Sequence, residues 1–148
     1  MRRAYISGAL TQAPNLEELR NFYEKVGEVC RSCGVEPYVP HQHSDPVLNA
    51  ELSPEEVYSR DKNYVVSSDL LIAYVGVPSL GVGMEIAYAD EHNVPIFLLY
   101  PCTQTISRMV RGLPKEKMLA EIAFSNEEEA LRRLRDSLWK WLKSTRSE

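Results

Sequence analysis

The sequence predicts a doubly wound α/β fold, in which a five-stranded parallel sheet lies between two layers of helices. Short apolar runs alternate along the chain with longer segments of helical periodicity, which is typical of successive strand–helix units. The run 69–75 is apolar almost throughout, as expected of a central strand that is buried on both faces. With 148 residues, 44% of them hydrophobic, the chain is expected to form a single domain over residues 1–148.

Each strand or helix is expected where the spacing of apolar residues fits that element and where residues typical of its ends flank it. The predicted strands are residues 3–7, 35–39, 69–75, 94–100 and 118–124. The predicted helices are residues 15–33, 53–68, 81–93, 105–111 and 126–143. The start of the second helix has the strongest signal, because Ser53 and Glu56 form a capping box around Pro54 at the first helical position. Together these elements predict a three-layer sandwich of the flavodoxin-like or Rossmann-like type.

The charge is unevenly distributed along the chain, whose formal net charge is -4. Residues 1–104 hold 7 Lys and Arg against 14 Asp and Glu, whereas residues 105–148 hold 10 against 7. An acidic main body lacks the clustered basic face that binds a nucleic-acid backbone, so no nucleic-acid polymer is expected as a partner. The basic tail alternates with acids and is interpreted as a solvated helix face.

The sequence contains neither a membrane-span pattern nor a secretory signal pattern. No run approaches the roughly 18 apolar residues that a membrane span needs. The N-terminus turns polar too early for a signal peptide. A cytoplasmic protein without a membrane partner is therefore expected.

Cys30 and Cys33 have the C-x-x-C spacing of redox pairs, but they close a predicted helix instead of opening one. A thiolate is disfavoured at a helix C-terminus, so core packing is favoured over redox chemistry.

The loops that follow the predicted strands are where a ligand is expected, because doubly wound sheets bind ligands beyond the carboxyl ends of their strands. Three loops qualify, at residues 8–14, 41–52 and 76–83. The third contains Ser79-Leu80-Gly81-Val82-Gly83, where glycines let peptide N–H groups approach an anion at a helix N-terminus. It matches neither the dinucleotide-binding motif nor the P-loop, so a plain tight turn is the alternative.

Two carboxyl groups near this loop are candidates for catalysis. Glu85 lies early in the helix that follows the glycines, where the helix dipole is expected to favour its ionised form and make it a nucleophile. Asp61 shares an apolar helix face with Val57, Tyr64 and Val65, so burial is expected to raise its pKa. Such a pair is the arrangement that glycosidic bond cleavage uses. The alternatives are a helix-capping Glu85 and a buried salt bridge from Asp61 to an Arg.

The segment His41-Gln42-His43-Ser44-Asp45 allows a metal cluster or a polar loop that closes over the ligand. The loop is favoured, because no second group of ligating residues appears elsewhere in the sequence. No metal and no cofactor are expected.

Taken together, these features resemble the nucleoside 2-deoxyribosyltransferase superfamily, and within it the 2'-deoxynucleoside 5'-monophosphate N-glycosidases. The resemblance spans about residues 4–112. It is carried by Tyr5-Ile6-Ser7-Gly8, by Asp61 followed by Asp69, by Pro78-Ser-Leu-Gly-Val-Gly-Met-Glu85, and by Ser107-Arg-Met-Val-Arg-Gly112.

The resemblance implies hydrolysis of the N-glycosidic bond of a nucleoside 5'-monophosphate through a covalent glycosyl-Glu85 intermediate. Asp61 would assist proton transfer, and Tyr5 would orient the nucleophile. The implied substrate-binding residues are Gly8, Ala9, Leu10, His41, Ser79, Gly81, Gly83, Met84 and Ser107. The resemblance also implies a homodimer in which Ser107 is contributed across the interface.

Two positions depart from the pattern of the family. Ala9 stands where the related monophosphate hydrolases have a further serine, and Thr11 stands where an arginine is expected. The phosphate would therefore be held largely by backbone amides and hydroxyl groups.

Two other functions remain open at this stage. A deoxyribosyltransferase would use the same Glu85 intermediate but pass the sugar to a second base. A non-catalytic nucleotide-binding module would have Asp61 and Glu85 far apart. The sequence specifies neither the base nor the choice between ribose and deoxyribose.

Overall fold

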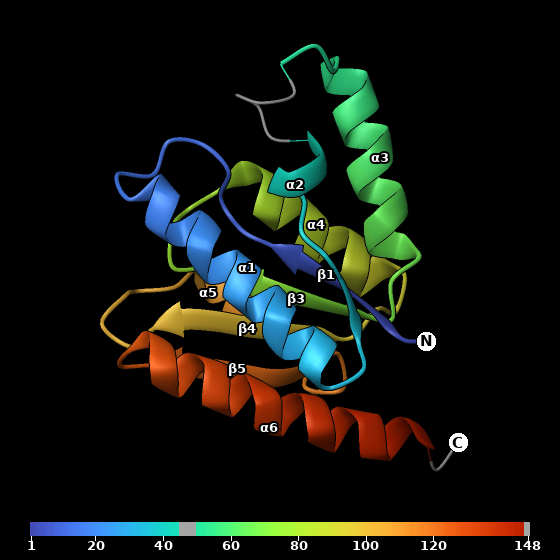
Figure 1. The fold of residues 1–148 in the computed structure, drawn as a ribbon, viewed down its shortest axis with the longest axis vertical. Helices are drawn as coiled ribbons and strands as arrows, with labels where there is room; N and C mark the ends of the chain where they lie inside the picture. Colours follow the sequence, from blue (N-terminus) through green and yellow to red (C-terminus); the bar gives the residue numbers. More distant parts are fainter. Residues whose placement is uncertain (45–49, 147–148) are drawn as a thin grey trace.

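The structure is a computed structural model, and it describes residues 1–44 and 50–146. Within these residues strands and helices alternate as the sequence predicts (Figure 1). The strands are β1 (Arg3–Ser7), β2 (Glu36–Tyr38), β3 (Leu70–Tyr74), β4 (Ile96–Pro101) and β5 (Met118–Phe124). The helices are α1 (Leu16–Ser32), α2 (His41–Ser44), α3 (Pro54–Val66), α4 (Leu80–Glu91), α5 (Arg108–Arg111) and α6 (Glu127–Arg146).

The five strands form one parallel sheet in the order β2-β1-β3-β4-β5. The chain builds outward from β1 in one direction and from β3 in the other. The strand order therefore reverses between β1 and β3, where Ser7 lies beside Ala73 in the register. At such a switch point the loops after the two strands diverge and leave a crevice for a ligand.

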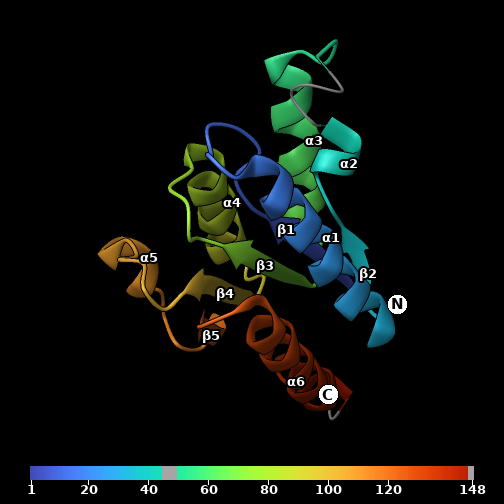
Figure 2. The ribbon, with the colours of Figure 1, turned by 60° about the vertical axis from the view of Figure 1, so that its left-hand side comes forward.

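Helices cover both faces of the sheet, which confirms the predicted three-layer arrangement. On one face α1 contacts β1, β2 and α6, and α6 contacts β5. On the other face α4 contacts β3, β4 and α3. Figure 2 separates the layers, with α4 on one side of the strands and α1 on the other. Each face has its own apolar cluster, centred on Phe22, Val26 and Leu134 under α1 and α6 and on Val82 and Ile86 under α4.

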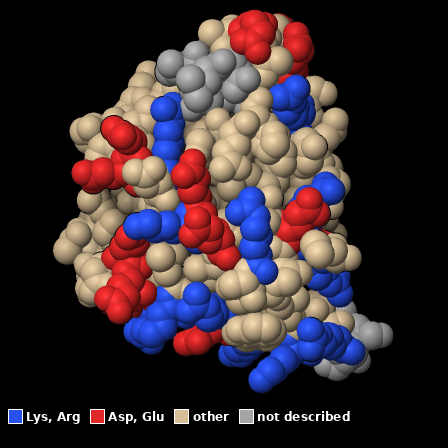
Figure 3. Space-filling model, in the orientation of Figure 1, with Lys and Arg blue, Asp and Glu red and all other residues tan. Residues whose placement is uncertain are grey.

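The face covered by α1 and α6 carries basic and acidic side chains in alternation (Figure 3). Lys and Arg gather along the border formed by α6. Such mixing of signs is typical of a solvated helix face.

The largest difference from the prediction is α2, one helical turn at residues 41–44 where a loop was expected. Its turn is closed by two backbone hydrogen bonds, in which the N–H of Gln42 donates to the Val39 carbonyl (3.0 Å) and the N–H of His43 donates to the Pro40 carbonyl (2.9 Å). Backbone bonds of this kind leave no side-chain periodicity from which the helix could be predicted. Residues 45–49 of the predicted loop, with Asp45, lie outside the described residues.

Three helices, α3, α4 and α5, begin at a serine side-chain cap. The backbone N–H of Glu56 donates to Ser53 Oγ (3.1 Å), so α3 begins as the capping box predicts. Ser79 caps α4 in the same way, with Val82 N donating to its Oγ (3.3 Å). The predicted helix 105–111 is shorter than expected, since Ser107 caps α5 and the helix begins only at Arg108.

Cys30 and Cys33 are both free thiols buried in the core under α1, which confirms the packing interpretation. Burial raises the pKa of the Cys30 thiol to about 12. None of the helices in the described ranges is both long and apolar enough for a membrane span.

Candidate functional site

A pocket of about 470 Å³ opens between α3 and α4, beyond the carboxyl end of β1. Its lining comprises Leu10, Ala50, Leu52, Pro54, Val57, Tyr58, Asp61, Lys62, Gly81, Met84, Glu85 and Tyr88. The two predicted carboxyl groups, Asp61 and Glu85, thus face one cavity although they belong to different helices. Of the predicted substrate-binding residues, Leu10, Gly81 and Met84 also line it.

The Glu85 carboxylate is held from β1 by two hydroxyl groups. Tyr5 donates a hydrogen bond to Oε2, and Ser7 donates one of 2.7 Å to Oε1. Tyr5 and Ser7 are two residues apart on one strand, so both side chains point to the same face of the sheet. Both are fully buried, and each oxygen of the carboxylate therefore has a fixed partner.

Sequence reasoning missed the role of Ser7. The signal was present, because Ser7 is the last residue of the predicted strand and alternates with Tyr5. A polar residue on the inner face of a strand end, next to a ligand loop, indicates a site residue.

The ionisation of Glu85 differs from the prediction. Its pKa is raised to about 7, mainly by burial; the hydrogen bonds from Tyr5 and Ser7 oppose the increase, and the charge of Asp61 adds to it. The expectation that the helix dipole dominates was wrong. Glu85 is the sixth residue of α4, beyond the first turn in which the dipole acts strongly, so desolvation prevails.

Asp61 lies on α3 and is half-buried at the wall of the pocket. Tyr64 and Val65 follow it on the same side of the helix, and Val65 is fully buried, as the predicted apolar face requires. The Asp61 carboxyl group is close enough to Glu85 for its charge to raise the Glu85 pKa. Two carboxyl groups with this mutual influence suit acid and nucleophile roles.

The first turn of α4, which contains both glycines, is open to a ligand. Gly81 and Gly83 are exposed, and no atom lies within 4 Å of the position where a side chain on Gly83 would begin. The loop after β1 is packed closely instead. A side-chain carbon on Gly8 would collide with the ring of Tyr23, whose hydroxyl donates to the Ala9 carbonyl (3.2 Å). Only glycine fits at position 8.

Six predicted substrate-binding residues are not part of the pocket lining: Gly8, Ala9, His41, Ser79, Gly83 and Ser107. His41 is buried against α1, with Nε2 3.0 Å from Glu24 Oε1. Ser107 is exposed at the start of α5, where its Oγ accepts a hydrogen bond from Val110 N (3.4 Å). Their roles in substrate binding stay predictions.

The described part of the segment 41–45 does not form a metal cluster. His43 stacks on Tyr38 with ring centroids 4.6 Å apart. Within residues 1–44 and 50–146, no three His, Cys, Asp or Glu side chains gather as a metal site requires.

The mouth of the pocket holds a cluster that sequence reasoning did not single out. Lys62 Nζ donates to Tyr58 Oη (3.2 Å) and lies 4.7 Å from the ring centroid of Tyr88. Tyr58 and Lys62 are four residues apart, and they flank Asp61 on the same helix face. The four-residue spacing of Tyr58 and Lys62 was the sequence feature from which this cluster could have been predicted.

Comparisons with known proteins place the chain in a family. No family model matches it. It is 32% identical over 133 residues to a 2'-deoxynucleoside 5'-phosphate N-hydrolase of Methanosarcina mazei, covering 88% of this chain and 79% of that protein. A protein of the same name from Syntrophotalea carbinolica is 40% identical over 84 residues, and the match spans 55% of this chain and 57% of that protein.

Solved structures agree on the fold. The CMP N-glycosidase of Clostridium botulinum superposes with a TM-score of 0.70 at 25% identity, covering 90% of this chain and 97% of that chain. A 2-deoxyribosyltransferase of Bacillus psychrosaccharolyticus has a TM-score of 0.63 at 18% identity over 86% of this chain and 88% of that chain, a likeness of fold alone.

The fold and the paired carboxyl groups of the pocket define the class of protein, a doubly wound N-glycosidase of the nucleoside 2-deoxyribosyltransferase superfamily. Within that class, the chain belongs to the 2'-deoxynucleoside 5'-phosphate N-hydrolase family. The resemblance seen in the sequence is thereby confirmed.

Proposed function

We propose that this protein hydrolyses the N-glycosidic bond of (deoxy)nucleoside 5'-monophosphates, releasing the free base and (deoxy)ribose 5-phosphate. One observation carries the proposal. The Glu85 carboxylate is held by Tyr5 and Ser7 at the wall of a pocket that Asp61 also lines. A fixed carboxylate facing a second carboxyl group across a cavity matches the requirements of glycoside cleavage with a covalent intermediate.

In the proposed mechanism, Glu85 attacks C1' of the sugar while the bond to the base breaks. Asp61 gives a proton to the departing base, which leaves as a neutral molecule. Water then attacks C1' of the glycosyl ester, Asp61 takes the proton of that water, and the Glu85 carboxylate is released. Tyr5 and Ser7 keep Glu85 aimed at C1', which lowers the cost of reaching the reactive geometry.

The 5'-phosphate is assigned to the start of α4. Backbone N–H groups at a helix N-terminus attract anions, and Gly81 and Gly83 leave room for close approach. Ser79 adds a hydroxyl at the same turn, and Leu10 of the loop after β1 lines the same pocket as Gly81. This arrangement supports a monophosphate over a free nucleoside.

A panel of ribo- and deoxyribonucleoside 5'-monophosphates and the matching free nucleosides tests the proposal, with chromatography to detect the released base. We expect cleavage of monophosphates and little cleavage of nucleosides. Equal cleavage of both would contradict the phosphate assignment. Formation of a new nucleoside after addition of a second free base would instead identify a transferase, and stabilisation by nucleotides without turnover would identify a binding module.

The pH dependence follows from the raised pKa of Glu85. Since Glu85 must be ionised to attack, kcat/KM is expected to rise with pH by about tenfold per unit up to about 7, and the need for a protonated Asp61 as the acid makes it fall again at higher pH. Profiles should be fitted between about pH 6 and 8, because the substrate phosphate itself ionises near pH 6. A profile that does not rise between pH 6 and 7 would show that the pKa of Glu85 is not raised in the free enzyme.

A homodimer that shares Ser107 across its interface is part of the proposal. Large apolar side chains are exposed at the starts of α4 and α5: Leu80, beside Gly81, is 92% exposed, and Met109, close to Ser107 in sequence, is 89% exposed. Such a surface favours a partner. A second subunit would cover these side chains and bring its Ser107 toward the phosphate.

Mixing two defective variants tests this arrangement. If Ser107 acts across the interface, a mixed dimer of Ser107→Ala and Glu85→Gln contains one site with both residues intact. Random exchange of subunits is then expected to restore about a quarter of the wild-type activity at low substrate concentration. No recovery, with exchange confirmed by mass spectrometry, would show that Ser107 does not act in this way.

A further inference from the structure

Three tyrosine rings form a continuous stack across β1, β2 and α3. Tyr5 and Tyr38 are partners in the register of β1 and β2, and their ring centroids are 5.5 Å apart. Tyr38 and Tyr64 lie closer, with centroids 3.9 Å apart and ring planes 15° from parallel. Residues from three separate parts of the chain are thus packed ring on ring.

The two ends of this stack lead to the two carboxyl groups of the site. At one end the Tyr5 hydroxyl donates to Glu85. At the other end Tyr64 follows Asp61 by three residues on α3, so both side chains lie on the same side of that helix. The Tyr38 ring therefore contacts both the residue that holds Glu85 and the helix that carries Asp61. Its size helps to set the spacing of the two carboxyl groups.

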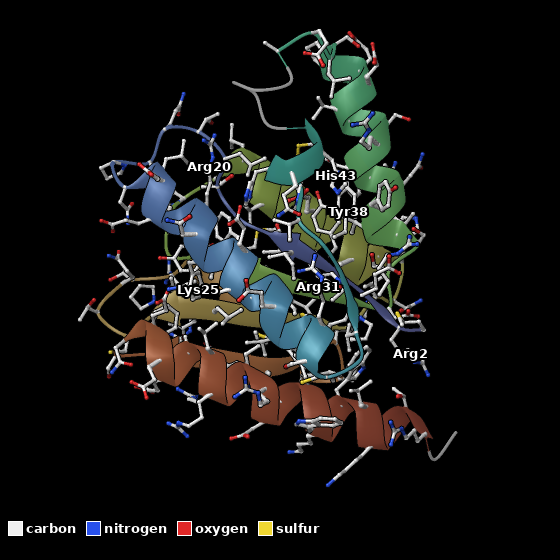
Figure 4. The ribbon with its side chains drawn as sticks, viewed as in Figure 1. Arg2, Arg20, Lys25, Arg31, Tyr38 and His43 are labelled. Carbon is white, nitrogen blue, oxygen red and sulfur yellow. The ribbon has the colours of Figure 1, made fainter. Side chains whose placement is uncertain are left out.

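The Tyr38 hydroxyl is unusual in having no hydrogen-bond partner among the described residues, although its oxygen is buried and the side chain is only 7% exposed. Leaving such a group unpaired in the interior costs about 1–3 kcal/mol. Burial, together with the nearby charge of Asp61, raises the pKa of Tyr38, so the hydroxyl stays protonated and remains a donor. Figure 4 shows Tyr38 and His43 close together where β2 leads into α2, beside α3.

We propose that Tyr38 is a positioning residue, whose hydroxyl donates a hydrogen bond to the Asp61 carboxylate during the reaction. The inference rests on the proposed function, in which Asp61 becomes an anion when it gives its proton to the departing base. A hydrogen-bond donor beside Asp61 stabilises the Asp61 carboxylate, which forms on proton transfer, more than it stabilises the protonated Asp61 present before the transfer. Such a difference lowers the barrier of the chemical step without strengthening substrate binding.

Tyr38→Phe isolates the hydroxyl, because phenylalanine keeps the ring in the stack. We expect kcat for a nucleoside monophosphate to fall by about 10- to 100-fold, the range for losing a hydrogen bond to a charged group, with KM within about twofold of wild type. The melting temperature should be unchanged or higher, since an unpaired buried hydroxyl is removed.

Tyr74→Phe is the matched control. Tyr74 is equally buried but belongs to the apolar cluster under α1 and α6, on the opposite face of the sheet. Its kcat should equal that of wild type. Wild-type kcat in Tyr38→Phe would overturn the proposal and leave Tyr38 a packing residue.

The same substitution in an Asp61→Asn background identifies the partner of the hydroxyl. If Tyr38 acts through Asp61, Tyr38→Phe should cost less than about twofold in that background. A loss that persists there, with a raised KM, would overturn the proposal by showing direct contact with the substrate. The failure of the proposed function gives a different result, since the wild-type protein itself would then cleave no nucleotide.

Discussion

Replacing Glu85 by Gln is expected to abolish turnover, with kcat reduced on the order of 10⁴-fold or more, because glutamine cannot form the glycosyl ester. Gln keeps the volume of the side chain and an oxygen that can accept from Tyr5 or Ser7. The fold should therefore persist, which near-wild-type circular dichroism would confirm. The measurement is release of base under single-turnover conditions. Activity within tenfold of wild type would exclude Glu85 as the nucleophile.

The same variant is expected to be more stable than the wild type at pH 8 but not at pH 5. Burial raises the folded-state pKa of Glu85 to about 7, above the ordinary value of 4.5. Between about pH 4.5 and 7 the carboxyl group ionises in the unfolded chain but stays protonated in the folded protein, so stability falls over this range and the full cost remains above pH 7. Glutamine avoids that cost, for a gain of about 1–3 kcal/mol at pH 8.

Urea denaturation of both proteins at pH 5 and pH 8 measures this difference. Glu28→Gln, which changes an exposed carboxylate of α1, serves as the control and should show no pH-dependent gain. If Glu85→Gln gives the same stability change at both pH values, the buried carboxylate is not the source of the effect.

Replacing Asp61 by Asn is expected to lower kcat by about 10²- to 10³-fold for natural bases, because the departing base then lacks its proton donor. The loss should shrink for a nucleotide analogue whose base leaves readily as an anion. Comparison of the two substrates therefore separates proton transfer from binding. Asp136→Asn, which changes an exposed carboxylate of α6, is the control and should have wild-type activity.

An equal loss for both substrates would contradict the role of Asp61 as the acid. The Asp61→Asn protein carries a second expectation, since the charge of Asp61 raises the pKa of Glu85. The acidic limb of its pH profile should move to lower pH. The shift should be modest, because desolvation is the larger cause and is unchanged.

Local features of the sequence were sufficient for much of the fold. The order of strands and helices followed from periodicity, and Ser53 begins α3 through a hydrogen bond that depends only on residues three apart. The one-turn helix α2 was missed because its hydrogen bonds are backbone bonds with no side-chain pattern. Both carboxyl groups of the site were identified from their places on predicted helices.

By itself, then, the sequence determined the order of the elements, the family and the two carboxyl groups, since each depends on spacing along the chain or on motifs within it. Only the tertiary structure decided how those groups behave. The partners of Glu85 come from β1, about 80 positions earlier, and the Tyr5–Tyr38–Tyr64 stack joins three distant segments. The pKa of Glu85 is set by desolvation, which depends on everything packed around the carboxylate. No local pattern carries that information, and for this reason the predicted dominance of the helix dipole was wrong.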